Sequence, residues 1–209
     1  MRRRDLTGAL LAGLALGSFG GAPFAQAQQA DQEADTPLPM KLVAGARAQI
    51  GVTTIYDPAY VRLDYPMGDV PIERGVCSDV VVRAFRSGGV DLQQVMHEDM
   101  RAHFSAYPKI WGLKRPDRNI DHRRVPNLEV FFARKGGEAP VTSSPDDYLP
   151  GDIVTWRLTG SGLPHCGVVS DRRRGGEPLV VHNIGAGAQE ENVLFAWTQT
   201  RHFRFEAWA

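Results

Sequence analysis

Cys77, His165 and His182 are the residues of this sequence best suited to nucleophilic chemistry. Cys77 stands where a proline-punctuated loop gives way to an apolar stretch with helical spacing, so we predict that it lies at the start of a helix. A thiol there lies among unpaired backbone N–H groups at the positive end of the helix dipole, which lowers its pKa and favours the thiolate. The position suits a nucleophile, and an inert core cysteine is the alternative.

A thiolate nucleophile needs an imidazole to exchange its proton and a further polar group to hold that imidazole in one tautomer. His165 stands at the mouth of one β-prone stretch, and His182 stands at the end of the next. If these stretches form adjacent antiparallel strands, the two histidines can approach each other across the ladder on one face.

Cys166 is the second of the two cysteines. In an oxidising compartment an even pair of cysteines is open to a disulfide, and that alternative stays open here. Successive strand residues point to opposite faces, so we expect Cys166 to point away from His165. This expectation argues against a bridge between Cys77 and Cys166.

The first 27 residues have the pattern of a cleavable export signal. Three arginines at positions 2–4 precede an uncharged apolar stretch over 6–19, and Ala25-Gln26-Ala27 supplies the small residues that a signal peptidase reads. The apolar stretch is shorter than the roughly 20 residues that a membrane span needs. We therefore predict a signal peptide over 1–27, by the general or the twin-arginine route, and a periplasmic or otherwise exported protein. An uncleaved helix is the alternative.

The rest of the chain has the length and composition of one domain. We expect a polar leader over 28–36 and a single domain over 37–209. The full chain has 24 basic and 24 acidic residues, and the predicted cleavage leaves a nearly balanced charge, so nucleic acid is not an expected partner. No stretch after residue 27 is apolar and long enough to cross a membrane.

The order of the predicted elements indicates an α+β domain. Apolar spacing and capping residues predict helices over 37–50, 77–86 and 91–104, and a short helix capped by Asn127 that ends before Gly136. Short β-prone stretches follow over 151–156, 167–170 and 179–182, with a hairpin tip over 171–176. Helices followed by an antiparallel meander are typical of the α+β class.

The order and spacing of six short motifs resemble those of the NlpC-type cell-wall cysteine peptidases, a bacterial branch of the papain-like fold. The resemblance runs from about Leu42 to Gly187. The corresponding stretches are Gln49-Ile50-Gly51, Tyr65-Pro66-Met67-Gly68, Cys77-Ser78, Pro150-Gly151-Asp152, His165-Cys166-Gly167 and Val180-Val181-His182.

This resemblance implies a papain-like α+β fold, with the nucleophile at a helix N-terminus packed on an antiparallel sheet, and no cofactor. It implies Cys77 as nucleophile, His165 as general base and then acid, and His182 as the residue that orients His165. Tyr65 would direct its hydroxyl toward the oxyanion beside the backbone N–H of Cys77, with Tyr56 as the alternative.

Two positions depart from that family, which usually has Asp before the cysteine and a small residue two places after it. Here Val76 and Asp79 stand there. With GVCSDVV, HEDM, NIDHRRVPN and VVHNIG, they make the chain look closer to the domain of unknown function 1287 family. Asp79 would either disfavour the thiolate of Cys77 or face away from it.

Polar residues between 119 and 124 are candidates for substrate recognition. Arginines there would bind the carboxylates of a peptide in bidentate fashion, and a solvated loop held by local Asp–Arg pairs is the alternative. The candidate substrate-binding residues are Asp79, Asp121, His122, Arg123 and Asn183. His97 and His103 are six residues apart and do not share a helical face, so we predict no metal site.

Together these patterns predict a monomeric exported thiol hydrolase, a cysteine peptidase or amidase, that acts on peptidoglycan stem peptides through Cys77, His165 and His182. The alternative function is a catalytically silent periplasmic binding module, or a regulator of cell-wall enzymes, on the same fold. In that alternative the cysteine and histidines serve packing alone.

Overall fold

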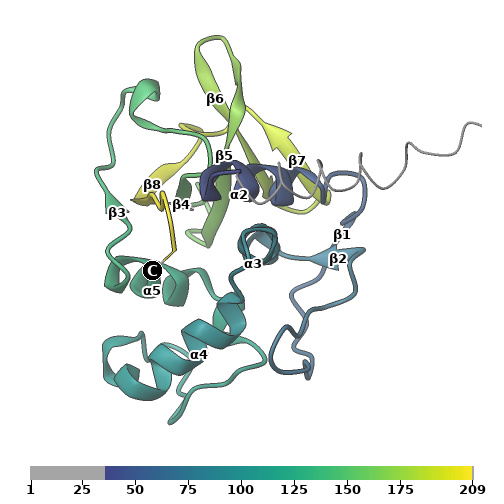
Figure 1. Cartoon of the computed structure of the whole chain (residues 1–209), viewed down its shortest axis with the longest axis vertical. Helices are drawn as coiled ribbons and strands as arrows, with labels where there is room; N and C mark the ends of the chain where they lie inside the picture. Colours follow the sequence, from purple (N-terminus) through teal and green to yellow (C-terminus); the bar gives the residue numbers. More distant parts are fainter. Residues whose placement is uncertain (1–35, 209) are drawn as a thin grey trace, which may run out of the picture. The chain divides into compact units, whose positions relative to one another are not determined.

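The computed structural model describes residues 36–208, and the fold concerns the compact unit that begins at Pro37 (Figure 1). The predicted signal peptide and the predicted leader up to residue 35 lie outside the described residues. Within 36–208, no helix combines the length and the apolar character needed to cross a membrane.

Four α-helices contribute to the domain. They are α2 (Leu38–Arg47), α3 (Cys77–Ser87), α4 (Leu92–His103) and α5 (Val125–Arg134). Short 3-10 turns cover Phe104–Ala106, Asp121–Arg123 and Pro145–Asp147. The prediction that Asn127 caps the last helix is wrong, because α5 begins at Val125 with a proline in its first turn. Asn127 instead donates from its side chain to the carbonyl of Asp121.

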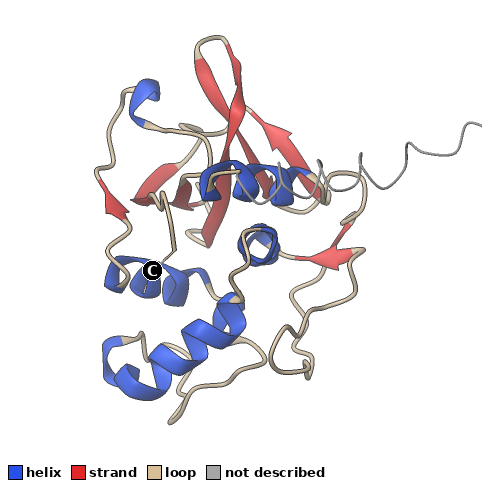
Figure 2. Ribbon diagram, in the orientation of Figure 1, coloured by secondary structure: helices blue, strands red, loops and turns tan. Residues whose placement is uncertain are grey.

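A six-stranded antiparallel sheet follows the helices in the chain, as the sequence predicts (Figure 2). Its order is β3-β8-β4-β5-β6-β7, and β4 to β7 form a meander. The strands are β3 (Glu138–Ala139), β4 (Ile153–Arg157), β5 (Pro164–Arg174), β6 (Glu177–Asn183), β7 (Ala188–Glu191) and β8 (Thr198–Phe203). The predicted hairpin tip is shorter than expected, since β5 and β6 pair as far as Arg174 and Glu177.

Helix α3 is buried on nearly all sides although its sequence is amphipathic, because its buried charged residues Asp79 and Arg83 each have an ion-pair partner. Its residues from Cys77 to Phe85 are all buried, and it packs on α2, β5 and β6. The opposite face of the sheet carries a second apolar cluster around Trp156 and Tyr148. The start of α3 is therefore held against the strands that carry the candidate histidines.

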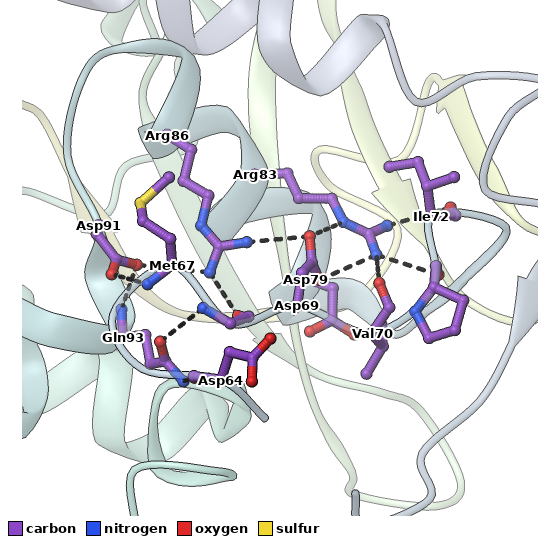
Figure 3. A network of polar contacts seen from close by, with 12 residues as sticks. Asp64, Met67, Asp69, Val70, Ile72, Asp79, Arg83, Arg86, Asp91 and Gln93 are labelled. Atoms are coloured by element: carbon purple, nitrogen blue, oxygen red, sulfur yellow. Dashed lines mark hydrogen bonds and ion pairs between the residues drawn. The ribbon is translucent and has the colours of Figure 1, made fainter. Parts of the chain in front are cut away.

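A buried arginine on α3 fixes the loop that leads to Cys77 (Figure 3). The guanidinium of Arg83 donates to the carboxylate of Asp69, to the hydroxyl of Thr53 and to the carbonyls of Val70 and Arg74. A buried cation is tolerated when its donors find acceptors, and here they also anchor the loop. The chain then enters β2 (Arg74–Gly75), which pairs in parallel with β1 (Ile55–Tyr56).

Candidate active site

Cys77 is the first residue of α3, where the sequence places it. The backbone N–H of Val76, the residue before it, donates to Asp79 Oδ2 at 2.7 Å, so the first turn is closed around the cysteine. Only 4% of Cys77 is exposed, and it lines a cavity of about 400 Å³. The cavity is walled chiefly by Tyr56, Pro58, Tyr60, Trp111, Ile120, Arg124 and Pro164.

The thiol of Cys77 has a pKa well below its ordinary value. The main cause is hydrogen bonding with the thiol of Cys166, and burial opposes it, while His165 lowers the pKa further by hydrogen bonding and by charge. Burial raises the pKa of the Cys166 thiol instead. Of the two neighbouring sulfurs, Cys77 is therefore the one that ionises more readily, since it also has the helix terminus and the imidazole beside it.

Cys166 points away from His165 as expected, but it does not lie away from Cys77. Strand alternation does separate the two residues, because Cys166 lies in the core between sheet and helices, whereas His165 packs on Trp156. The core side of β5, however, is the side that faces α3, so Cys166 lies beside Cys77 rather than away from it. Both cysteines are free thiols in the structure.

His165 and His182 meet across the sheet. Nε2 of His165 lies 2.9 Å from Nδ1 of His182, and Nε2 of His182 lies 3.0 Å from Oε2 of Glu191 on β7. Burial lowers the pKa of His182 to about 3, with the charge of His165 as a further cause, so His182 is neutral. A neutral His182 that donates to Glu191 accepts from Nε2–H of His165, which leaves Nδ1 of His165 as the basic nitrogen.

Sequence reasoning missed Glu191. It lies in a polar strand next to Glu190, with no local motif to separate it from a solvated glutamate. Its role follows only from the pairing of β6 with β7, which puts Gln189 opposite His182 and brings Glu191 within reach. The three side chains form a hydrogen-bonded chain, His165–His182–Glu191.

Gly167 allows the two histidine-bearing strands to approach. A Cβ atom at this position would lie 2.5 Å from Cγ1 of Val180 and 3.1 Å from Cβ of His182. The ring of His165, which contacts the ring of His182, also packs against the rings of Trp156 and Trp197, with centroid separations of 5.8 and 5.5 Å. The glycine therefore explains part of the His-Cys-Gly motif.

The structure replaces Tyr65 by Tyr56 as the tyrosine near Cys77. Tyr65 does not line the Cys77 cavity; its hydroxyl lies 3.1 Å from Nδ1 of His97 on α4. Its loop is drawn to α4 by Gln93, which bonds the backbone of Gly68. Tyr56 lines the cavity, and burial raises its pKa to about 12, with a further contribution from Cys77.

Pairing between β1 and β2 accounts for the position of Tyr56. Tyr56 lies opposite Gly75, two residues before Cys77. A phenol kept neutral by this environment can donate its O–H to an oxyanion.

Asp79 is not available to a substrate and does not leave its charge exposed to Cys77. Both of its carboxylate oxygens accept from the guanidinium of Arg123, at 2.8 and 2.9 Å. Arg123 also donates to the carbonyls of Asp57 and Ala59, which hold the loop on one side of the cavity. Asp79 is thus engaged in an internal bidentate pair, whereas Arg123 also lines the Cys77 cavity, and its substrate-binding role stays a prediction.

The other three candidate substrate-binding residues are also buried. Asp121 accepts from Arg124 and from the backbone of Asp117, and burial raises its pKa. His122 is 3% exposed, and burial lowers its pKa to about 3. Asn183 donates to the carbonyl of Gly75 at 3.0 Å and so helps to hold the segment before Cys77. These three residues do not line the Cys77 cavity.

An α+β domain with a buried thiol at a helix start and a hydrogen-bonded pair of histidines beside it defines a cysteine–histidine type of site. The chain belongs to the family described as Domain of unknown function (DUF1287), whose model matches residues 43–205. It is 62% identical over 167 residues to "Uncharacterized protein YijF" of Escherichia coli (strain K12), covering 79% of this chain and 81% of the relative. No solved structure matches the chain.

Proposed function

We propose that this protein is an exported thiol hydrolase with Cys77 as nucleophile. The observation that carries the proposal is the chain His165–His182–Glu191, which ends at a thiol whose pKa is lowered. A nucleophile, a base and an oriented third group are the parts that acyl transfer requires. The same arrangement supports, as part of the proposal, a variant of the NlpC-type, papain-like fold.

The reaction begins when the sulfur of Cys77 attacks an amide carbonyl. The backbone N–H of Cys77 and the hydroxyl of Tyr56 donate to the oxyanion that forms. His165, protonated by the thiol, then gives that proton to the leaving amine, and the C–N bond breaks. Water attacks the thioester with its proton taken by His165, the acid product leaves, and Cys77 regains its proton.

The proposed substrate is an amide bond in a peptidoglycan stem peptide, and the proposed active form is a monomer. The predicted export signal over 1–27 and the resemblance to cell-wall peptidases support this substrate class and a periplasmic location. The cavity beside Cys77 combines aromatic walls with Arg124, whose guanidinium lies over the ring of Trp111 at 4.1 Å. Such walls suit a peptide with mixed polar and apolar groups.

Digestion of purified muropeptides tests the proposal. Wild-type protein should release new products, and Cys77→Ala and Cys77→Ser should release none, because both variants lack the thiolate. Arg174→Ala, at the end of β5 and away from Cys77, serves as the control variant and should match the wild type. Identical product profiles for wild type and Cys77→Ala would contradict the hydrolase.

A binding module without catalysis is the second candidate. The observation that favours it is the 4% exposure of Cys77, which is that of a packing cysteine. The rate of alkylation of Cys77 against pH separates the two. A midpoint near the ordinary thiol value of about 8.5 favours the binding module, and a midpoint well below it favours the hydrolase.

A further inference from the structure

A second cavity adjoins the one that holds Cys77. It has a volume of about 750 Å³ and is lined by Tyr60, His97 and residues 112–119. Tyr60 lines both cavities, so its side chain stands between them. Trp111 and Ile120, which flank residues 112–119 in the chain, line the Cys77 cavity. The loop over 111–120 therefore forms part of the wall of both cavities.

This second cavity carries an excess of positive charge. Lys114, Arg115 and Arg118 line it and are exposed, and within residues 36–208 no carboxylate forms an ion pair with any of them. Other arginines near the site are paired, as Arg123 is with Asp79 and Arg124 with Asp121. Lys114, Arg115 and Arg118 thus differ from these neighbouring arginines in having no ion-pair partner within residues 36–208.

The only acidic residue among the residues that line the second cavity is already engaged. Asp117 accepts from the hydroxyl of Tyr60 at 3.1 Å, and from the backbone and side chain of Asn119 at 2.9 and 3.0 Å. These bonds hold the loop over 112–119 in place and direct the carboxylate of Asp117 toward Tyr60 and Asn119. Asp117 forms no ion pair with the three cations in the described part of the chain, and the lining of the cavity keeps a net positive charge.

The ring of Tyr65 holds one of these cations in place. The guanidinium of Arg118 lies over the ring of Tyr65, 5.2 Å from its centroid, while the hydroxyl of Tyr65 is bonded to His97. Stacking on a ring leaves the N–H edge of a guanidinium free to bind a planar anion. The pKa of His97 is lowered by burial and by the charges of Arg101 and Arg118, which favours its neutral form.

We infer that the second cavity is a subsite for a carboxylate of the peptide whose amide bond is presented to Cys77. This inference rests on the proposed hydrolase, because it assigns one part of that enzyme's substrate. Arginine binds carboxylates through two parallel hydrogen bonds, and Lys114 adds a point charge to the same space. Tyr60 separates the carboxylate subsite from the reacting bond.

Binding to the full-length Cys77→Ala variant tests the subsite without turnover. The probes are a stem tetrapeptide as the free acid, the same peptide with every carboxylate converted to an amide, and inorganic phosphate. We expect calorimetric titration to show about tenfold tighter binding of the free acid than of the amide. This preference should decrease as the salt concentration rises.

Removal of the cations should remove the preference. In the Cys77→Ala background, Arg115→Ala/Arg118→Ala should bind the acid and the amide equally, and Arg174→Ala, an exposed arginine on β5, should keep the tenfold difference. The exposed positions of Arg115 and Arg118 should leave the thermal transition unchanged, which a melting curve checks.

Three results would overturn the subsite: no binding of the free acid, equal binding of acid and amide, or a preference that survives Arg115→Ala/Arg118→Ala. Phosphate that binds as tightly as the free acid would overturn the assignment to a peptide carboxylate. Discrimination between acid and amide by a protein that hydrolyses no muropeptide would support a carboxylate-binding cavity but reject the hydrolase to which the subsite is assigned. Hydrolysis of muropeptides without discrimination between acid and amide would support the hydrolase and reject the carboxylate subsite.

Discussion

Oε2 of Glu191 lies 3.0 Å from Nε2 of His182. Through His182 this carboxylate acts on His165, the proposed base, so removal of either partner should affect the reaction. We expect His182→Ala to lower kcat about a hundredfold or more, because His165 loses its orienting partner. Glu191→Ala should cost about tenfold or less, since 42% of the Glu191 side chain is exposed and its charge is screened.

Rates of muropeptide hydrolysis by a conservative variant of Glu191 separate an orienting role from loss of structure. Glu191→Gln keeps a hydrogen-bond acceptor and should recover most of the activity that Glu191→Ala loses. Glu177→Ala, a substitution of a half-buried residue at the start of β6, is the control. Wild-type rates in His182→Ala would reject the proposed role of the histidine pair.

Tyr56 and Tyr65 offer a matched pair of substitutions. Tyr56→Phe removes the hydroxyl from the Cys77 cavity and should lower kcat by about a hundredfold, the usual cost of losing one oxyanion donor. Tyr65→Phe removes a hydroxyl of the same type that bonds to His97 instead, and should leave kcat unchanged. Steady-state rates on one muropeptide decide between them, and the reverse ranking would restore Tyr65.

Cys166 is expected to tune the reactivity of Cys77. Cys166→Ala removes the contact that most lowers the pKa of Cys77, so the midpoint of Cys77 alkylation should move to higher pH. Cys166→Ser keeps a hydrogen-bond donor at the same place and should shift the midpoint of Cys77 alkylation by less. Intact mass gives the control, because a wild-type mass lower by two hydrogen atoms would reveal a disulfide in place of this contact.

Stability should fall in mild acid because two buried histidines resist protonation. In the folded protein the pKa values of His122 and His182 are each lowered from 6.5 to about 3 by burial. Below pH 6.5 the unfolded chain binds protons that the folded chain does not, so the free energy of unfolding decreases as pH falls toward 3. Above pH 6.5 this contribution is complete.

Urea unfolding between pH 7 and pH 5 measures this slope, which should be about 1 kcal/mol per pH unit for each histidine. His122→Gln and His182→Gln should each reduce it. Asp152, paired with His202 and Arg204, has a pKa below 3.8, so its loss of stabilisation begins at lower pH and stays separate. A slope unchanged in both variants would contradict the assignment.

Gly167→Ala should destabilise the protein by about 1–3 kcal/mol, since the added Cβ would meet Val180 at 2.5 Å and crowd His182. Val180→Ala shortens the side chain that the new Cβ would meet. The double variant Gly167→Ala/Val180→Ala should therefore lose less free energy of unfolding than the sum of the losses in the two single variants. Chemical denaturation of the two single variants and the double variant measures this coupling. Additive costs would show that the close approach of β5 and β6 does not require the glycine.

Local sequence was sufficient for the features that local physics controls. Helical spacing and the loop before it placed Cys77 at the start of α3, and alternating β-prone stretches predicted the antiparallel sheet. The two histidines were identified from their places at the ends of neighbouring strands. These signals depend on residues close together in the chain, whose backbone preferences are visible in the sequence.

Only the tertiary structure decided which side chains share the site. Tyr56 and Tyr65 are alike in sequence terms, and the pairing of β1 with β2 brings Tyr56 to Cys77, while contacts with α4 hold Tyr65 elsewhere. Glu191 reaches His182 through strand pairing, and Cys166 faces Cys77 because α3 covers that side of β5. Such choices depend on packing between distant segments, which no local pattern of residues encodes.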